Sequence, residues 1–276
     1  MLTSTPPSWP AYRLDQVLTQ SRLQHRAALG LYLPVGYPSR SASLDALHAM
    51  SEHSDVLELG VPTEDAYLDG VTVQHAAAQA LEGGFRMADL FTTTADLASS
   101  PAALVAMTYW APVKAYGPRL FAEQFAAAGG AGVLIPDLPD RAAAHWQHAT
   151  ETAGLHNVPL IPAHASAARL HAIGRSSSGM AYAPAIPGLT GAAGPLSPYL
   201  PRLVRRLREA TRLPVAVGIG ISTPALAAQA SAYADAVVVG SAVIRRMHTA
   251  TNSAAAAAAA ARDFAAGVRG DPRPAA

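Results

Sequence analysis

Short apolar runs, several of them rich in β-branched residues, recur along the whole chain. Most of these runs lack the strict alternation of apolar and polar residues that is typical of a strand with one face in water. Continuous apolar runs of this length favour parallel strands that are buried on both faces. We therefore predict eight strands, at residues 29–35, 55–61, 103–109, 132–136, 159–163, 179–184, 214–218 and 236–240.

Segments rich in alanine and leucine, each of helical length, lie between these runs. Strand and helix alternate roughly every 25–30 residues, and about eight such units predict an α/β protein with a (β/α)8 TIM barrel. The alternative, a doubly wound open sheet, would be favoured by a glycine-rich turn after the first strand, but the turn at 34–38 lacks the dinucleotide-binding spacing. The predicted helices are 44–51, 73–81, 119–128, 141–153, 200–210 and 225–232.

Two stretches lie outside this alternation. Residues 1–24 are expected to carry an extra N-terminal helix, at 13–23, under the barrel floor. The alanine run 254–261 is expected to continue the last helix, because alanine favours helix, and the chain end is expected to fray. No change of composition divides the chain, so we predict one domain over residues 1–276, with the barrel core at about 25–250.

Composition narrows the function classes. The chain has 276 residues, of which 50% are hydrophobic and 14% charged, with a formal net charge of +1. This balance gives no electrostatic footprint for nucleic acid or for an acidic membrane surface. The absence of cysteine excludes disulfides and cysteine nucleophiles. Neither a signal-peptide pattern nor an apolar run of membrane-spanning length is present, so we expect a cytoplasmic protein.

Active-site residues of a barrel lie where strands end and βα loops begin. Glu58 lies inside the apolar second strand, where a carboxylate is costly unless it has a partner or a task. If its side chain points into the barrel mouth, desolvation should raise its pKa and make it a candidate proton donor. The alternative is a glutamate that is paired structurally with a basic side chain.

The loop after this strand holds three acids and no base, and its last acid, Asp69, precedes Gly70, where a helix is expected to begin. Asp69 is either a functional carboxylate or an acid that the dipole of the following helix favours.

Glycines mark the last two strand ends, in Gly218-Ile219-Gly220 and in Gly240-Ser241. Glycine lets backbone N–H groups approach a phosphate, and the following helix adds its N-terminal dipole. Phosphate binding after strands seven and eight recurs in barrels, although simple turn glycines would give the same pattern. The loop rich in Gly and Pro at 186–191 is either a lid over a ligand or an ordinary loop.

Two other site types are not expected. The ten histidines form no metal constellation, because His145 and His148 lack a third ligand at a sensible spacing. A Ser/His/Asp hydrolase is not expected either, because no Gly-x-Ser-x-Gly elbow is present.

Taken together, the strand ends resemble the tryptophan synthase alpha subunit family, which includes stand-alone indole-3-glycerol-phosphate lyases. The resemblance runs from about residue 13 to about residue 248, and its segments agree in order and spacing. Besides Asp65, Asp69-Gly70, Val73-Gln74, Tyr116-Gly117 and Tyr182, it rests on LPVGYP (33–38), LELGVP (57–62), MTYWAP (107–112), LIPDLP (134–139), GLTG (188–191), GIGIS (218–222) and GS (240–241).

This resemblance implies a (β/α)8 lyase of tryptophan biosynthesis that splits indole-3-glycerol phosphate into indole and glyceraldehyde 3-phosphate by retro-aldol chemistry without a cofactor. It makes Glu58 the general acid/base that protonates the indole C3 and handles the glyceryl hydroxyl. It makes Asp69 the carboxylate that holds the indole N–H, and it places Tyr182 beside the glutamate. It further implies that Tyr109, Leu134 and Thr190 contact the substrate and that Gly191, Ile219, Gly220, Gly240 and Ser241 hold its phosphate.

Three departures from the family pattern fall on lid or partner-facing positions: residues 63–66, residues 185–187 and Ala111. They leave open whether a tryptophan synthase beta subunit binds or the chain acts alone. The alternative function is a catalytically weak barrel that activates a beta-type subunit, which the presence of both carboxylates disfavours. Another phosphate-binding barrel, such as a sugar-phosphate isomerase, would share the glycine loops but does not suit the Glu58/Asp69 pair.

Overall fold

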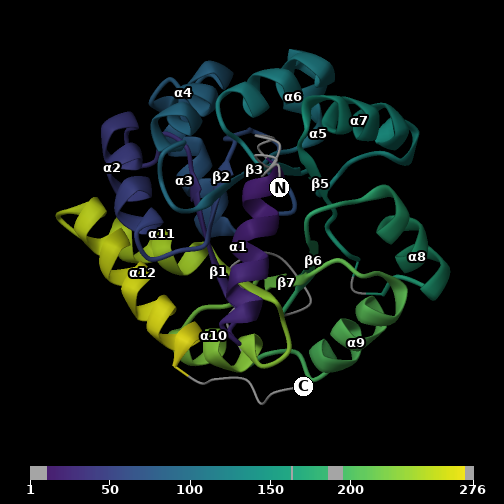
Figure 1. Ribbon diagram of the computed structural model, residues 1–276. Coiled ribbons are helices and arrows are strands. Elements are labelled where there is room, and N and C mark those ends of the chain that lie inside the picture. Colours follow the sequence, from purple (N-terminus) through teal and green to yellow (C-terminus); the bar gives the residue numbers. More distant parts are fainter. Residues whose placement is uncertain (1–10, 163, 186–194, 271–276) are drawn as a thin grey trace, which may run out of the picture.

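The computed structural model of the protein describes residues 11–162, 164–185 and 195–270. These residues form eight parallel strands in a nearly closed barrel, with helices around the outside (Figure 1). The strands are β1 (Ala28–Pro34), β2 (Val56–Gly60), β3 (Ala103–Met107), β4 (Gly132–Leu134), β5 (His156–Val158), β6 (Ala181–Pro184), β7 (Val215–Gly218) and β8 (Ala236–Val239). The helices are α1 (Ala11–Leu23), α2 (Arg40–Ser51), α3 (Val71–Glu82), α4 (Met87–Leu97), α5 (Trp110–Tyr116), α6 (Pro118–Ala127), α7 (Asp140–Ala153), α8 (Ala167–Ser176), α9 (Leu200–Ala210), α10 (Pro224–Ser231), α11 (Ser241–His248) and α12 (Ser253–Arg269).

The strands follow one another around the barrel in the order β5-β4-β3-β2-β1-β8-β7-β6. The remaining gap, between β5 and β6, is spanned by two backbone hydrogen bonds of Tyr182. Its N–H donates to the carbonyl of Pro159 over 2.9 Å, and its carbonyl accepts from the N–H of Ile161 over 2.8 Å. This contact closes the barrel, and the predicted TIM-barrel class is confirmed.

The predicted fifth strand, 159–163, is wrong, because the strand is β5 at His156–Val158. Pro159 and Pro162 carry no backbone N–H and cannot donate to a ladder, so the chain keeps only an isolated bridge at Leu160. Residue 163 lies outside the described residues. The other seven predicted strands match observed strands, with boundaries that differ by at most two residues.

Four helices were not predicted, namely α4, α5, α8 and α11. The first carries three consecutive threonines, the second is a seven-residue helix with a proline, and the third has one fully buried side chain, Leu170. The fourth has one alanine and no leucine.

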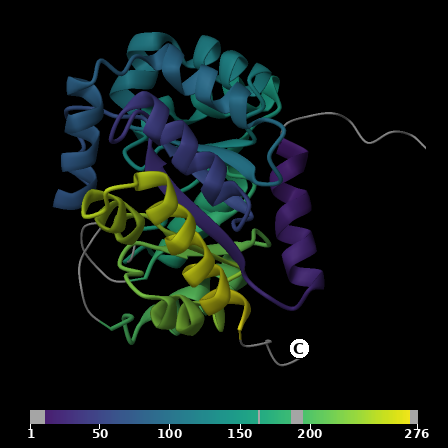
Figure 2. The same cartoon turned by 90° about the vertical axis from the view of Figure 1, so that its left-hand side faces the viewer.

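The predicted N-terminal helix is confirmed as α1, which lies across the N-terminal ends of the strands (Figures 1 and 2). Its buried Leu14 and Leu18 belong to one apolar cluster with the strand residues Ala28, Val56 and Ala103. The helix therefore covers the apolar side chains at the barrel floor, which would otherwise face water.

The alanine run 254–261 is helical, as predicted, but it belongs to a helix of its own. Residues 249–252 are not helical and separate α11 from α12. Asn252 caps α12, because its side chain accepts the N–H of Ala255 over 2.9 Å. The small alanine side chains let α12 pack closely against α2, as Figure 2 shows. The expected fraying of residues 271–276 lies outside the described part of the chain.

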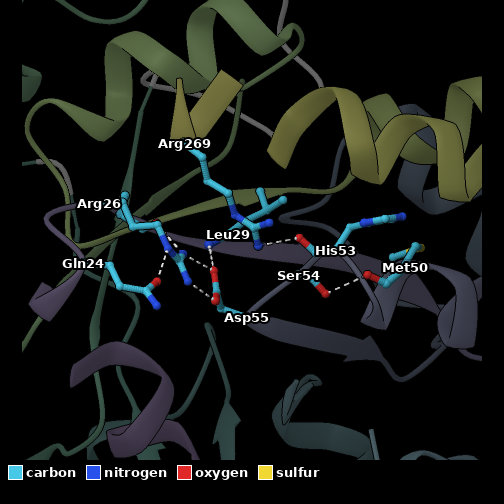
Figure 3. Close-up of polar contacts among 9 residues, drawn as sticks. Gln24, Arg26, Leu29, Met50, His53, Ser54, Asp55 and Arg269 are labelled. Atoms are coloured by element: carbon cyan, nitrogen blue, oxygen red, sulfur yellow. Dashed lines mark hydrogen bonds and ion pairs between the residues drawn. The ribbon is translucent and has the colours of Figure 1, made fainter. Parts of the chain in front are cut away.

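A polar cluster fixes the entry to β2 at the barrel floor (Figure 3). Arg26 donates two hydrogen bonds, of 2.6 and 2.7 Å, to the two carboxylate oxygens of Asp55, which also accepts the N–H of Leu29 over 2.8 Å. Nearby, Arg269 of α12 donates to the carbonyl of His53 over 3.1 Å. These contacts fix the positions of β1, β2 and the last helix relative to one another.

Over residues 11–162, 164–185 and 195–270, no helix combines the length and the hydrophobicity needed to cross a membrane.

Candidate active site

One cavity opens at the carboxyl ends of the strands, where a barrel places its catalytic groups. Eight of the eleven residues that the sequence singled out line this cavity: Glu58, Leu134, Asp69, Tyr182, Ile219, Gly220, Gly240 and Ser241. Thr190, Gly191 and the predicted lid, 186–191, lie outside the described residues. Tyr109 is not among the residues that line the cavity, but it contacts one of them, Asp69.

Glu58 points into this cavity from β2, whose five residues are all buried. Its side chain is 6% exposed, and no hydrogen bond or ion pair joins it to another described residue. As expected from the sequence, burial raises its pKa, to about 8, and the charge of Asp69 contributes further. At neutral pH the side chain is therefore a neutral acid with a proton to give.

Asp69 lies at the end of the β2–α3 loop, two residues before α3 begins. The side chain of Gln74 holds this loop, because its amide donates to the carbonyls of Asp69 over 2.8 Å and of Ala66 over 3.0 Å. Gly70 is the N-cap of α3, so the prediction of a helix start at Gly70 is confirmed. The carboxylate is buried at 6% exposure and shares the cavity with Glu58.

Tyr109 couples the third strand end to this loop. Its hydroxyl donates to Oδ2 of Asp69 over 3.1 Å and accepts the N–H of Leu68 over 3.1 Å. Burial and the charge of Asp69 raise the pKa of Tyr109, so the hydroxyl keeps its proton and remains a donor. The substrate contact that the resemblance implies for this residue stays a prediction, and the structure adds a contact with the carboxylate.

Two further tyrosines face the cavity, Tyr182 of β6 and Tyr32 of β1. Each ring fits over a glycine that has no room for a side chain: a Cβ on Gly218 would lie 2.0 Å from the hydroxyl of Tyr182, and one on Gly60 would lie 2.5 Å from the hydroxyl of Tyr32. Burial is the main cause of a raised pKa in both tyrosines. The second cause is the negative charge of Glu58 for Tyr182 and that of Asp69 for Tyr32. Both hydroxyls therefore stay protonated.

Tyr32 was missed at the level of sequence, although a signal was present. Side chains at matching positions of adjacent parallel strands lie on the same face, and Tyr32 is in register with Glu58. A tyrosine in the otherwise aliphatic 29–35 run is therefore a candidate for the same cavity.

The seventh and eighth strand ends form the opposite side of the cavity. Ile219 has a φ of +58° and Gly220 a φ of +97°, and a β-branched residue in the left-handed region is an outlier that often marks a functional turn. On the other strand end, Ser241 is the first residue of α11, with Gly240 as its N-cap. Two turns of this kind, one at a helix N-terminus, can present backbone N–H groups to an anion.

The rest of the cavity wall is apolar and contains Met107, Leu134, Leu160, Ile221 and Val238. The arrangement thus offers a neutral acid, a second carboxylate, an anion-binding side and a hydrophobic wall. Such a site suits an aromatic substrate that carries a phosphate and reacts by proton transfer.

Comparison with known proteins gives one family. The family model described as tryptophan synthase alpha chain matches residues 18–269. Among curated proteins, the tryptophan synthase alpha chain of Streptomyces coelicolor is 38% identical over 262 residues, covering 93% of this chain and 97% of the relative. The alpha chain of Mycobacterium tuberculosis is 39% identical over 260 residues, covering 94% and 95% respectively.

Solved structures agree with this result. A structure of Mycobacterium tuberculosis tryptophan synthase superposes with a TM-score of 0.87 at 39% identity, covering 93% of this chain and 98% of the other. The tryptophan synthase alpha subunit of Legionella pneumophila gives a TM-score of 0.84 at 27% identity, covering 94% and 99%.

Proposed function

Since the chain belongs to the tryptophan synthase alpha chain family, it is a carbon–carbon lyase that cleaves indole-3-glycerol phosphate, and we propose that Glu58 and Asp69 divide the chemistry between them. The products are indole and glyceraldehyde 3-phosphate. No cofactor is needed in this scheme, because Glu58 gives one proton to C3 and takes one proton back from the glyceryl hydroxyl, with no net change of oxidation state.

The first step is protonation of the ring. Glu58, as the neutral acid, delivers its proton to C3 of the indole, which becomes tetrahedral while positive charge develops at N1. Asp69 accepts the ring N–H and stabilises that charge, because a fixed carboxylate in a desolvated site acts strongly on a developing cation. Tyr109 holds the carboxylate in place through its 3.1 Å hydrogen bond.

The second step is cleavage. Glu58, now a carboxylate, takes the proton of the hydroxyl on the carbon bonded to C3. The C–C bond breaks, its electron pair returns to the ring, and the hydroxyl carbon becomes the aldehyde. Glu58 thereby regains its proton, and the cycle can repeat without any external acid or base.

The observation that carries this proposal is the state of Glu58, which is buried in the barrel mouth, has no partner among the described residues and has a pKa near 8. A structural glutamate would be expected to have a paired base or several hydrogen-bond donors. The anion-binding side at Gly220 and Ser241 supports the orientation of the substrate, with its phosphate there and its ring toward the carboxylates.

The direct test is release of indole from indole-3-glycerol phosphate by wild type and by Glu58→Gln. Positioned proton transfer contributes about 10²–10⁴ in rate, so we expect that loss in kcat with nearly unchanged substrate binding. Wild-type turnover in Glu58→Gln would remove this residue from the mechanism.

We further propose that the catalytic face contacts a tryptophan synthase beta subunit. Tyr67 and Val71, which flank Asp69, expose 58% and 82% of their surface, and exposed apolar side chains together often mark a protein contact. Indole release should be measured with and without a beta subunit. Faster release with the subunit would support an assembled enzyme, and no change would support a chain that acts alone.

A further inference from the structure

The ring of Tyr32 runs along the cavity from the anion-binding side to the carboxylates. At its Cβ end, a Cβ placed on Gly240 would lie 3.0 Å from Cδ1 of the ring. At its hydroxyl end, a Cβ placed on Gly60 would lie 2.5 Å from the oxygen. Gly60 at the end of β2 and Gly240 after β8 therefore leave the space that this ring occupies, and a side chain at either position would collide with it.

The hydroxyl of Tyr32 belongs to a buried residue and has no hydrogen-bond partner among the described residues. The residue is 9% exposed and lines the cavity, and no hydrogen bond joins its oxygen to another residue of the described chain. Buried hydroxyls are hydrogen-bonded in the great majority of proteins, so an unpaired one that faces a cavity points to a ligand.

The substrate of the proposed function offers one polar group that has no assigned contact. Its phosphate is assigned to the glycine turns, its ring N–H to Asp69, and the hydroxyl next to the ring to Glu58. The hydroxyl on the middle carbon of the glyceryl chain remains. That chain must cross from Gly240 to Glu58, which is the path that the Tyr32 ring follows.

We propose that the hydroxyl of Tyr32 donates a hydrogen bond to the middle-carbon hydroxyl of indole-3-glycerol phosphate and so positions the reacting carbon. This inference rests on the proposed function. The contact fixes rotation of the chain between its phosphate end and its ring end, and the hydroxyl that reacts therefore stays in front of Glu58. Tyr32 is a positioning and specificity residue that takes no proton in either step.

The test compares two substrates, indole-3-glycerol phosphate and an analogue that lacks only the middle hydroxyl. Tyr32→Phe should lower kcat/KM for the natural substrate about 3- to 10-fold, as for a lost neutral hydrogen bond, and should leave kcat/KM for the analogue within about twofold. In the wild type, the analogue should already be slower than the natural substrate by the same factor. Tyr182→Phe is the matched comparison, because its hydroxyl is in the same cavity under the charge of Glu58 and its loss should slow both substrates alike.

A binding measurement separates a lost contact from a damaged site. A ligand with indole and phosphate joined by a plain three-carbon chain should bind wild type and Tyr32→Phe with the same Kd, and both proteins should melt at the same temperature. An equal fall on both substrates, no fall on the natural one, or weaker binding of the plain-chain ligand would overturn the proposal. If the wild type releases no indole at all, the proposed function fails and this inference falls with it, whereas an active wild type matched by Tyr32→Phe removes only the inference.

Discussion

The hydroxyl of Tyr109 lies 3.1 Å from Oδ2 of Asp69 and equally close to the backbone nitrogen of the preceding residue, Leu68. One side chain on the third strand end thus fixes both the carboxylate and the backbone of a loop that the second strand carries. The loop could move only if both hydrogen bonds were broken, and this gives Asp69 a defined position before any substrate arrives.

Tyr109→Phe should therefore loosen Asp69 without removing it. We expect kcat/KM to fall about tenfold and the free energy of unfolding to fall by about 1–3 kcal/mol, because a buried carboxylate and a backbone N–H each lose one hydrogen bond. Steady-state kinetics and urea unfolding measure the two effects. Tyr116→Phe serves as control, because its hydroxyl contacts Gln124 on the protein surface. Unchanged kinetics in Tyr109→Phe would show that Asp69 is held by other contacts.

The acid form of Glu58 predicts a pH dependence of activity. Because its pKa is raised to about 8, kcat/KM should decrease above that pH by about tenfold per unit. The pH–rate profile of the isolated chain measures this limb. Glu64→Gln, an exposed acid in the neighbouring loop, should keep it. A profile that stays flat to pH 10 would mean that another group supplies the proton.

The same pKa predicts a pH dependence of stability. Between pH 4.5 and about 8, Glu58 carries a proton in the folded chain but not in the unfolded chain, so stability decreases as pH rises through this window. Glu58→Gln removes this penalty, which is on the order of a few kcal/mol for a shift of this size. The variant should therefore unfold at higher denaturant concentration than wild type at pH 8, and the difference should shrink toward pH 5. A difference independent of pH would contradict the assignment.

Gly218→Ala should displace the ring of Tyr182. The new Cβ would lie 2.0 Å from the hydroxyl and 2.6 Å from Cζ of a ring that is itself buried, so the ring or the strand must shift. We expect at least a tenfold loss of kcat and about 1–3 kcal/mol of destabilisation from overpacking. In a Tyr182→Ala background the same substitution should cost much less stability, because the clash is gone. Equal costs in the two backgrounds would exclude the clash as the cause.

The floor cluster of Figure 3 gives a prediction about stability alone. Asp55→Asn removes the charge that Arg26 and the N–H of Leu29 share, at side chains that are 12–15% exposed. We expect a loss of about 3 kcal/mol, as for a buried pair that is broken, with kcat within twofold of wild type. Asp263→Asn, in the exposed pair with Arg246, should change stability by less than about 1 kcal/mol. Similar losses in both variants would mean that burial does not distinguish these two pairs.

Much of the architecture could be predicted from the sequence, because a barrel buries its strands on both faces and so leaves continuous apolar runs. An apolar run does not predict a strand where burial and hydrogen bonding conflict. Residues 159–163 are such a run, because their prolines prevent a ladder. Helix α4 was also missed, because its threonines hide the helical period that Leu90, Thr94 and Leu97 follow.

At the site, Glu58 could be predicted because a carboxylate in an apolar strand is unusual by itself. Tyr32 could not be predicted, because its place in the cavity depends on the residue beside it on the next strand and on two glycines far away in sequence. The contact of Tyr109 with Asp69 also required the fold, since 40 residues separate the two side chains in the chain.

In the described part of the chain, β5 and β6 share no continuous ladder. Three backbone hydrogen bonds bridge them, two made by Tyr182 and one from the N–H of Ser178 to the carbonyl of Asn157, and in the strand order this junction lies opposite β1 and β2. The barrel wall therefore has less backbone pairing at this junction than where two strands share a ladder. The junction lies across the barrel from the strand that carries Glu58. We expect the amide protons of Leu160, Ile161 and Tyr182 to exchange with deuterium sooner than those of β1 and β2. Local opening at this junction would leave β1 and β2, and with them Glu58, in place.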